Sequence, residues 1–310
     1  LLVTPLYPPD IGGPSQYAFH LKEEFVKRGH EVRIATFKFE RKLPFLIRHI
    51  YFFFKVLPNI FCSYRVLSLD AISVGFPASV ASFLFGKKYI MRLGGDFLWE
   101  SYIESTGCEV DLENFYKIPR VFSFKQKLIK KVFNFVIKNA DKVVINSEWY
   151  GEIISKYYDV NSLKLVYIEN YFGKINTEGI SDNNHVVSSS RNIKLKNITK
   201  LKESFQKAKN KLNDINLFDT QVPHTELQNI IKSSHAVVVV SFSEVNPNLI
   251  IDGLSFGKPF ILTKFNGLNS RFMNMGIFVD PFDQVSIENA ILKMYDPLIY
   301  EMLCKNIREC

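Results

Sequence analysis

The sequence predicts an α/β protein with two doubly wound, Rossmann-like domains that face a cleft. Short apolar runs, rich in β-branched residues, alternate along the chain with segments of helical periodicity. A polar stretch rich in Gly, Asn and Asp, residues 172–185, divides this alternation into two sets. Because parallel strands require crossover helices, each set is expected to form its own parallel sheet. The length of 310 residues agrees with two domains, which we place at residues 1–171 and 172–310.

The first set begins with a strand–loop–helix–strand unit. Residues 1–7 are an apolar run, and residues 8–15 are rich in Pro and Gly. A helix is expected to follow and to end near Gly29, because apolar residues recur at helical spacing from Ala18 onward. Since the chain starts at Leu1 inside the apolar run, without a Met, we expect a trimmed N-terminus. The other elements expected in this set are strands 31–37, 87–93, 141–147 and 163–171 and helix 123–139.

The second set contains a strand unusually rich in valine. "HAVVVVSF", residues 235–242, is typical of a strand buried on both faces of a parallel sheet. The tail, residues 286–308, has helical periodicity. The other elements expected in this set are strands 186–190, 215–218 and 258–263 and helices 196–212, 224–233 and 247–256.

The charge is basic, at +8 from 39 basic and 31 acidic residues. The excess concentrates in Lys125–Lys142 and Lys194–Lys211, where the lysines are spaced like the polar faces of helices. These faces are either simply solvated or attract phosphates of a nucleotide or of an anionic membrane. No basic motif interleaved with aromatics occurs, which argues against nucleic acid as a partner. The four cysteines lack metal-ligand spacing, so we expect reduced thiols in a cytoplasmic protein.

Two apolar stretches invite a membrane interpretation. Residues 43–61 are rich in aromatics but are interrupted by Arg48, Lys55 and Pro58, and residues 71–86 are too short to span a bilayer. Neither is expected to cross a membrane. Residues 43–61 form either a buried helix or a helix that lies on a membrane surface, because they mix bulky aromatics with basic side chains.

The segment "SEVNPNLIIDGLSFGKP", residues 243–259, predicts a ligand site. Asn246 suits an N-cap and Pro247 the first helical position, and Gly257 suits the end of the helix. Such a helix starts where a parallel strand ends, and its free amide groups and dipole favour an anion. Glu244 precedes the helix and Asp252 lies in its second turn, so sugar hydroxyls would satisfy both carboxylates. In the plainer interpretation, Glu244 is a surface residue and Asp252 binds neighbouring backbone amides.

This segment resembles the glutamate–seven–glutamate region of retaining glycosyltransferases of family 4, which have the GT-B fold. The resemblance implies that Glu244 contacts the donor sugar as a catalytic residue and that Asp252 binds the ribose. It also implies that the start of the helix contacts the donor diphosphate, through Asn246, Asn248 and Leu249.

Three further stretches are similar to motifs of the same family. The loop at Gly12 and Gly13 looks like its N-terminal glycine loop, where a missing side chain lets the backbone approach a ligand. Arg191 and Lys196 in "SRNIKLKN" are similar to its arginine–lysine pair, which neutralises the diphosphate. "RLGGDFLWE" resembles a segment that places Asp96, a second candidate catalytic residue, near the acceptor.

The sequence departs from the family pattern in three places. The second carboxylate belongs to Asp252, whose side chain is one methylene shorter than the Glu of the family pattern. Residues 208–224 contain no glycine-bearing strand–loop, so the donor domain is expected to be shortened and the base of the nucleotide is left open. Val245 and Asn246 stand where many members carry a glycine–aromatic pair.

The resemblance implies transfer of a sugar from a nucleotide diphosphate sugar to a hydroxyl acceptor, with retention. No Asp-x-Asp motif occurs, so no metal or other cofactor is expected. The expected acceptor is a glycan or a lipid-linked molecule, and the expected location is the cytoplasm, at the inner face of the membrane. Two alternatives remain open. One is a catalytically degenerate nucleotide- or sugar-binding module, and the other is a nicotinamide-dependent oxidoreductase, which the loop "PPDIGGPS" fits poorly.

Overall fold

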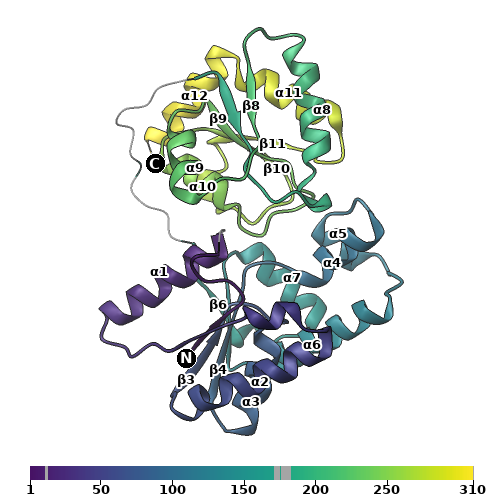
Figure 1. Cartoon of the computed structure of the whole chain (residues 1–310). Coiled ribbons are helices and arrows are strands. Elements are labelled where there is room, and N and C mark those ends of the chain that lie inside the picture. Colours follow the sequence, from purple (N-terminus) through teal and green to yellow (C-terminus); the bar gives the residue numbers. More distant parts are fainter. Residues whose placement is uncertain (11–12, 171–174, 176–182, 310) are drawn as a thin grey trace. The chain divides into compact units, whose positions relative to one another are not determined.

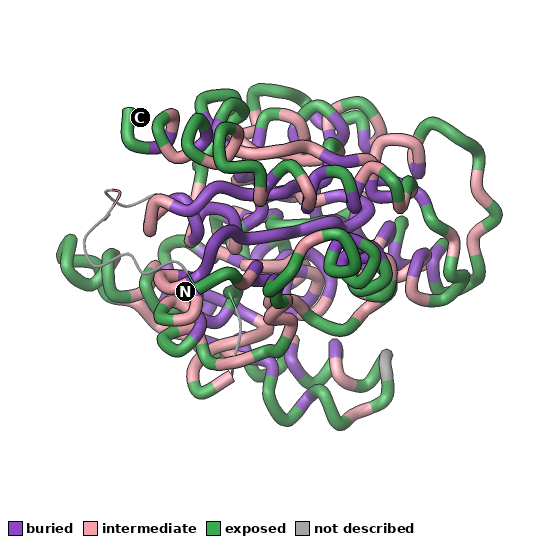
Figure 2. Tube along the Cα trace, turned by 90° about the horizontal axis from the view of Figure 1, so that it is seen from above, coloured by how far each residue is buried: buried purple, intermediate pink, exposed green. Residues whose placement is uncertain are grey.

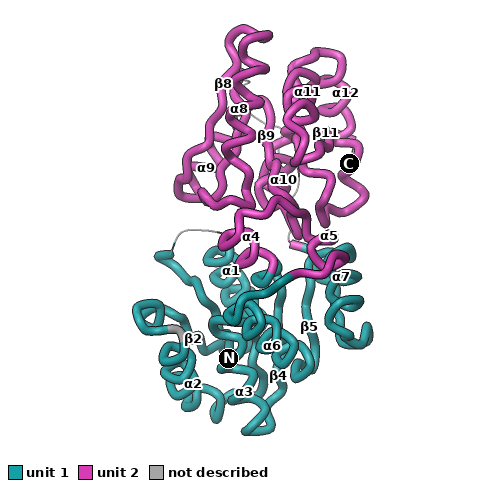
Figure 3. Tube along the Cα trace, turned by 90° about the vertical axis from the view of Figure 1, so that its right-hand side faces the viewer, with its two compact units in different colours: residues 1–98, 121–169 teal, residues 99–120, 170–310 magenta. Residues whose placement is uncertain are grey.

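The computed structural model describes residues 1–10, 13–170, 175 and 183–309, and it contains two compact units, each built on a parallel sheet (Figures 1 and 3). The predicted α/β class with two doubly wound sheets is therefore confirmed. Unit 1 comprises residues 1–98 and 121–169, and unit 2 comprises residues 99–120 and 170–310. This division differs from contiguous domains at 1–171 and 172–310 because residues 99–120 group with unit 2. Gly12 and most of the expected linker 172–185 lie outside the described residues.

Unit 1 has a parallel sheet in the order β2-β1-β3-β4-β5-β6. Its strands are β1 (Leu2–Thr4), β2 (Ile34–Thr36), β3 (Arg65–Ser68), β4 (Lys88–Leu93), β5 (Lys142–Ile145) and β6 (Leu165–Tyr167). Its helices are α1 (Gly13–Lys27), the short η1 (Phe39–Lys42), α2 (Phe45–Phe61), α3 (Gly75–Leu84), α6 (Phe124–Asn139), α7 (Glu148–Tyr158) and the short η2 (Ser162–Lys164). Helix α4 (Phe97–Thr106) begins at the end of unit 1 and continues into unit 2. Strand β3 and helices α3, α4 and α7 were not expected from the sequence.

Unit 2 has a parallel sheet in the order β11-β10-β9-β7-β8. Its strands are β7 (His185–Val187), β8 (Asn216–Phe218), β9 (Ala236–Val239), β10 (Phe260–Thr263) and β11 (Gly276–Val279). Its helices are α5 (Leu112–Lys117), η3 (Lys194–Lys196), α8 (Ile198–Lys209), α9 (His224–Lys232), α10 (Asn248–Ser255), η4 (Ser270–Phe272), α11 (Gln284–Met294) and α12 (Pro297–Arg308). Strand β11 and helix α5 were missed.

The C-terminal tail forms two helices, where the sequence pattern indicated one helical stretch at 286–308. The Asp296 side chain accepts hydrogen bonds from the amides of Leu298 and Ile299, which caps a new helix. Pro297 lies in the first turn of α12, where a missing N–H costs nothing, and its ring prevents α11 from continuing.

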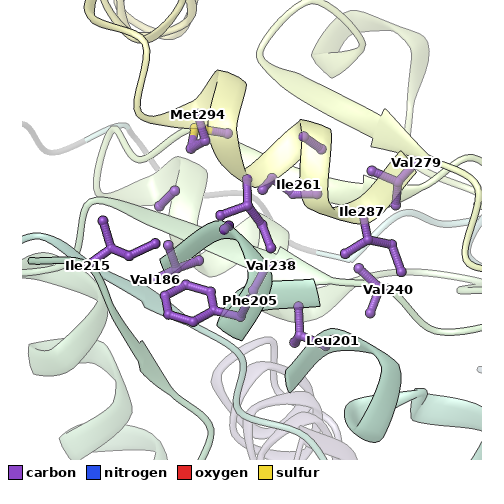
Figure 4. Packing of buried hydrophobic residues seen from close by; sticks show 14 of the residues in the cluster. Val186, Leu201, Phe205, Ile215, Val238, Val240, Ile261, Val279, Ile287 and Met294 are labelled. Carbon is purple, nitrogen blue, oxygen red and sulfur yellow. The ribbon is translucent and has the colours of Figure 1, made fainter. Parts of the chain in front are cut away.

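Strand β9 is the centre of unit 2 and explains the valine run. Ala236, Val238 and Val240 pack on one face of the sheet with Leu201 of α8, as the cluster in Figure 4 shows. Val237 and Val239 pack on the other face, with residues of α9, α10 and α12. All four strand residues are buried because both faces are covered, as the prediction of a doubly buried strand required. Figure 2 shows buried residues gathered along the inner segments of the trace and exposed residues along its outer turns.

Helix α10 approaches β9 more closely than a side chain would permit. A Cβ atom at Gly253 would lie 2.5 Å from Val237 Cγ2, far inside van der Waals contact. The glycine therefore seats the helix directly on the strand. Gly257, with φ of +68°, ends this helix in the left-handed conformation, as its position in the sequence predicts.

Among the described residues, every helix falls short of the length and apolarity that a membrane crossing requires.

Candidate functional site

Glu244 lies in the loop between β9 and α10, and its backbone is held in place. Its N–H donates to the Phe265 carbonyl at 3.0 Å, and its own carbonyl accepts from the Gly267 N–H at 2.9 Å. These bonds extend parallel pairing beyond β9, with Glu244 opposite Asn266. The loop is thus anchored to the connection after β10, so the carboxylate of Glu244 starts from a well-defined backbone position.

The Glu244 carboxylate forms a polar cluster with Lys196 and Ser241. Its Oε1 atom accepts a hydrogen bond from Ser241 Oγ at 2.7 Å. The same oxygen forms an ion pair with Lys196 Nζ. The side chains of Lys196 and Glu244 are only 19% and 12% exposed, so solvent screens this pair far less than a surface pair. A cation and an anion held side by side at low exposure can bind a ligand that carries both charge and hydroxyl groups.

Lys196 is positioned by the residue that follows it. Asn197 adopts the left-handed conformation, with φ of +57°, between η3 and α8. Its side-chain amide donates to the Val240 carbonyl at 3.2 Å and to the Pro281 carbonyl at 2.8 Å, and it is buried. This amide ties the lysine loop to the end of β9. Sequence analysis did not identify Asn197, although Asn is one of the few residue types that adopt this conformation readily.

The start of α10 differs from the sequence prediction by one residue. The helix begins at Asn248, and Pro247 occupies the N-cap position with ψ of 84°, so Asn246 is not the N-cap. The reason is that the first helical hydrogen bonds are accepted by the Pro247 carbonyl, from the amides of Ile250 and Ile251. Pro247 therefore precedes the helix and is not its first residue. Because helix geometry leaves the first amides without intrahelical partners, the N–H groups of the first turn, including those of Asn248 and Leu249, mark an anion-binding position.

The outermost side chain of this turn is exposed. Asn248 is exposed and accepts a hydrogen bond from Asn170 Nδ2 at 2.6 Å. Asn246 and Leu249 are partly buried. Asn246, Asn248 and Leu249 lie close to Glu244 in the chain, at the start of α10, as the sequence indicated. What suits this position to an anion is the backbone N–H groups of the helix start and not these side chains.

Asp252 contacts a histidine and not a backbone amide. His224, the first residue of α9, lies 3.2 Å from Asp252 through Nε2 and Oδ2. The hydrogen bond to Asp252 raises the pKa of His224 above its usual value, and burial opposes this shift. His224 was not predicted as a site residue, because no local pattern around it indicates that α9 and α10 lie side by side.

This pair should make the unfolding free energy depend on pH. The folded-state pKa of His224 is raised above the usual histidine value of 6.5, so the stabilisation is complete below about 6.5 and is lost as the pH rises through the folded-state pKa. Asp252→Asn should bring the NMR titration midpoint of the His224 ring back toward 6.5, with His224→Gln used to assign the signal. An unchanged midpoint in Asp252→Asn would show that the carboxylate does not cause the shift.

A segment from the first half of the chain lines this site within unit 2. Leu195 N–H, next to Lys196, donates to Glu104 Oε1 at 3.2 Å. On the other loop, Leu112 N–H donates to Ser243 Oγ at 2.9 Å, and both groups are buried. Residues 99–120 therefore contact the lysine loop and the glutamate loop together. Sequence analysis did not identify Glu104 or Ser243, because their partners lie about 90 and 130 positions away.

Arg191 is not part of the Lys196–Glu244 cluster. Its guanidinium pairs with Glu100 at 3.2 Å, and its side chain is 60% exposed. An ion pair this exposed contributes little stability, so Arg191 is available to exchange Glu100 for another anion.

Asp96 and Gly13 belong to unit 1, whereas Lys196, Glu244 and Asp252 belong to unit 2. Asp96 is buried in the turn between β4 and α4, 4% exposed. Near it, the Tyr150 hydroxyl donates to the Gly95 carbonyl at 2.9 Å, and burial together with the charge of Asp96 raises the pKa of Tyr150. Gly13 is the first residue of α1. Gly12, its predicted companion, lies outside the described residues.

Comparisons with solved structures identify the fold. The chain is similar to sucrose-phosphate synthase from Thermosynechococcus elongatus, with a TM-score of 0.75 and 16% identity over 99% of this chain and 93% of that chain. It is similar to WaaG, a glycosyltransferase involved in lipopolysaccharide biosynthesis, with a TM-score of 0.69 and 10% identity over 100% and 94% of the two chains. It is similar to HepE of Anabaena in complex with UDP, with a TM-score of 0.64 and 13% identity over 99% and 93%.

No family model matches the chain, and no curated protein matches it. Identities of 10–16% show the fold alone. That fold is GT-B, with two Rossmann-like parallel-sheet units, as the sequence predicted.

Proposed function

We propose that this protein is a retaining glycosyltransferase that moves a sugar from a nucleotide diphosphate sugar to a hydroxyl acceptor without a metal ion. One observation carries the proposal. Glu244, in the turn that leads into α10, forms a cluster with Lys196 and Ser241, in a chain whose solved neighbours are glycosyltransferases. One of those neighbours holds UDP. Membership of family 4 is part of the same proposal, supported by the residues of the glutamate segment.

In this mechanism the donor diphosphate binds at the start of α10. Lys196 and the amides of Asn248 and Leu249 face the phosphates, and Arg191 leaves Glu100 to join them. Positive charge and the helix dipole then stabilise the negative charge that develops on the leaving diphosphate, which is the task a metal ion performs elsewhere. The leaving phosphate takes the proton of the acceptor hydroxyl on the same face of the sugar.

Glu244 orients the donor sugar and stabilises the positive charge that builds on its ring. In the free protein the carboxylate is already oriented by Ser241 and Lys196, so little reorganisation is needed when the donor binds. Asp252 accepts a hydrogen bond from the ribose, and His224 holds its second oxygen. The shorter side chain of Asp252 relative to Glu makes this contact looser or water-mediated.

The acceptor in this proposal is a glycan or a lipid-linked molecule. Asp96 of unit 1 serves the acceptor side, supported by its burial and by the adjacent Gly94–Gly95 turn. We place the reaction in the cytoplasm at the inner face of a membrane, because the N-terminal half is basic and rich in aromatic residues.

A thermal-shift screen against UDP, GDP, ADP and their common sugars tests the proposal. A ligand that binds only the folded state at 100 times its Kd adds about 2.7 kcal/mol to the free energy of unfolding, so the melting temperature of unit 2 should rise with one nucleotide series. No shift with any nucleotide would contradict the donor site. A shift without slow donor hydrolysis or transfer would instead support the degenerate binding module.

A further inference from the structure

Helix α2 exposes an apolar face that its own fold does not cover. Its inner face packs against unit 1 through the buried residues His49, Phe52, Val56 and Ile60, spaced three and four apart. The opposite face is also apolar where a surface helix is normally polar. The residues exposed on that face are Leu46, Ile47, Ile50, Tyr51, Phe54 and Phe61, and all of them except Tyr51 are more than half exposed.

Exposed aromatics from neighbouring elements extend this face. Phe39 of η1 contacts Tyr51, with ring centroids 5.6 Å apart. At the other end of the helix, Phe61 contacts Phe85, with centroids 4.6 Å apart, and Phe83 is 67% exposed. Exposed apolar residues gathered on one helix face and its neighbours in this way mark an interaction surface, unlike the scattered apolar residues of an ordinary protein surface.

The charge of the same helical layer is entirely positive. Helices α2, α3 and α6 pack side by side in unit 1 (Figure 1), and none of them contains an Asp or a Glu. They contain seven basic residues, which are Arg48, Lys55, Lys125, Lys127, Lys130, Lys131 and Lys138. Lys55 pairs with the buried Glu40 of η1 at 2.6 Å, so the basic charge without an acidic partner lies mainly on α6.

The lysines of α6 are directed to solvent. All five are exposed, and within the described parts of the chain no ion pair joins any of them to a carboxylate. By contrast, Lys200 and Lys202 of α8 pair with Glu109 and Asp219. The other two lysines of this helix, Lys207 and Lys209, donate to the neutral side chains of Gln284 and Asn216. Half of the lysine charge on α8 is therefore paired with carboxylates, whereas the lysine charge on α6 is not.

We infer that the outer surface of α2, α3 and α6 is a docking surface for an anionic lipid membrane. A bilayer interface offers apolar contact for the α2 face and negative headgroups for the α6 lysines, and no other partner matches both features as directly. Ile50 and Phe54 insert at the level of the acyl chains, and Lys127 and Lys131 contact headgroups. This inference depends on the membrane location proposed above but not on the transfer chemistry.

Flotation of the full chain with lipid vesicles tests the inference. Binding should be strong to phosphatidylcholine vesicles that contain phosphatidylglycerol and weak to phosphatidylcholine alone. It should also weaken when salt is raised from 0.1 M to 1 M, where the Debye length falls from about 10 Å to about 3 Å. Equal binding to both vesicle types, or no binding to either, would overturn the inference.

Two charge variants locate the surface. Lys127→Glu with Lys131→Glu should weaken binding to anionic vesicles by more than about tenfold, since each lysine near the surface contributes roughly 1 kcal/mol. Lys207→Glu with Lys209→Glu on α8 changes the net charge equally. Its binding to anionic vesicles should stay within about twofold of that of the unaltered protein. An equal loss in both variants would show that net charge alone, and not this surface, attracts the protein.

Two apolar variants test insertion. Ile50→Ser with Phe54→Ser should reduce binding by on the order of tenfold, whereas Leu298→Ser with Met302→Ser on the exposed side of α12 should not. Sedimentation of the same proteins without lipid detects the competing occupant. A dimer that only the α2 variant dissociates would assign this face to a second copy and overturn the membrane assignment. Nucleotide-induced thermal shifts are measured on all variants as well. A variant that loses membrane binding but keeps the nucleotide shift has an intact donor site, so the two proposals are tested separately.

Discussion

Glu244→Gln is expected to lower the rate of sugar transfer by a factor of about 10²–10³. The glutamine keeps the size of the side chain and can still accept the hydrogen bond from Ser241, but it removes the negative charge beside the sugar ring. Nucleotide diphosphate affinity should be unchanged or tighter, because Lys196 no longer shares its charge with a carboxylate. The loss should therefore appear in kcat and not in the dissociation constant of the nucleotide.

Turnover of a verified donor, together with nucleotide titration, measures this separation. Glu226→Gln on the exposed side of α9 changes the charge of unit 2 equally and should leave both quantities unaltered. Full transfer activity in Glu244→Gln would show that the carboxylate has no catalytic part. A parallel loss of nucleotide binding would point instead to damage to the loop.

Lys196→Gln is expected to weaken nucleoside diphosphate binding by about 10–100-fold, the range for losing a charge-assisted hydrogen bond of roughly 1.5–3 kcal/mol. The affinity for the nucleoside without phosphates should not change, because the lysine lies at the phosphate end of the proposed site. Calorimetric titration of both ligands measures the two affinities. Lys202→Gln on α8, whose lysine pairs with Asp219, is the matched control.

The same variant has a consequence for stability. The Glu244 side chain is only 12% exposed, and removing Lys196 leaves its carboxylate without a cation. This should lower the free energy of unfolding by about 1–3 kcal/mol. Lys196→Gln combined with Glu244→Gln should recover part of that loss, since the uncompensated charge is gone. A double variant less stable than Lys196→Gln would show that the two charges are not coupled.

Local patterns in the sequence were sufficient for much of the fold. The valine run at 235–242 predicted a strand buried on both faces, and β9 is that strand. Gly257 predicted the end of α10 through its left-handed conformation. By contrast, β3 and β11 were missed. The split between α11 and α12 was overlooked although Asp296-Pro297 marks it.

The candidate site was only partly predictable. The segment around Glu244 pointed to a carboxylate near a helix start, because strand end and helix start are adjacent in the chain. The partners of these residues were not predictable, since Lys196 lies 48 positions from Glu244 and His224 lies 28 positions from Asp252. Arg191 was expected beside Lys196, yet it contacts Glu100 in a segment from the other half of the chain.

By itself, therefore, the sequence determined the fold class and most of the elements, because helical and strand periods and turn residues act over a few positions. It also determined that a carboxylate and a helix start share one loop. Only the tertiary structure decided which cation meets Glu244, that a histidine holds Asp252, and that α2 leaves an apolar face uncovered. These outcomes depend on which elements become neighbours in the folded chain, and no short stretch of sequence encodes that.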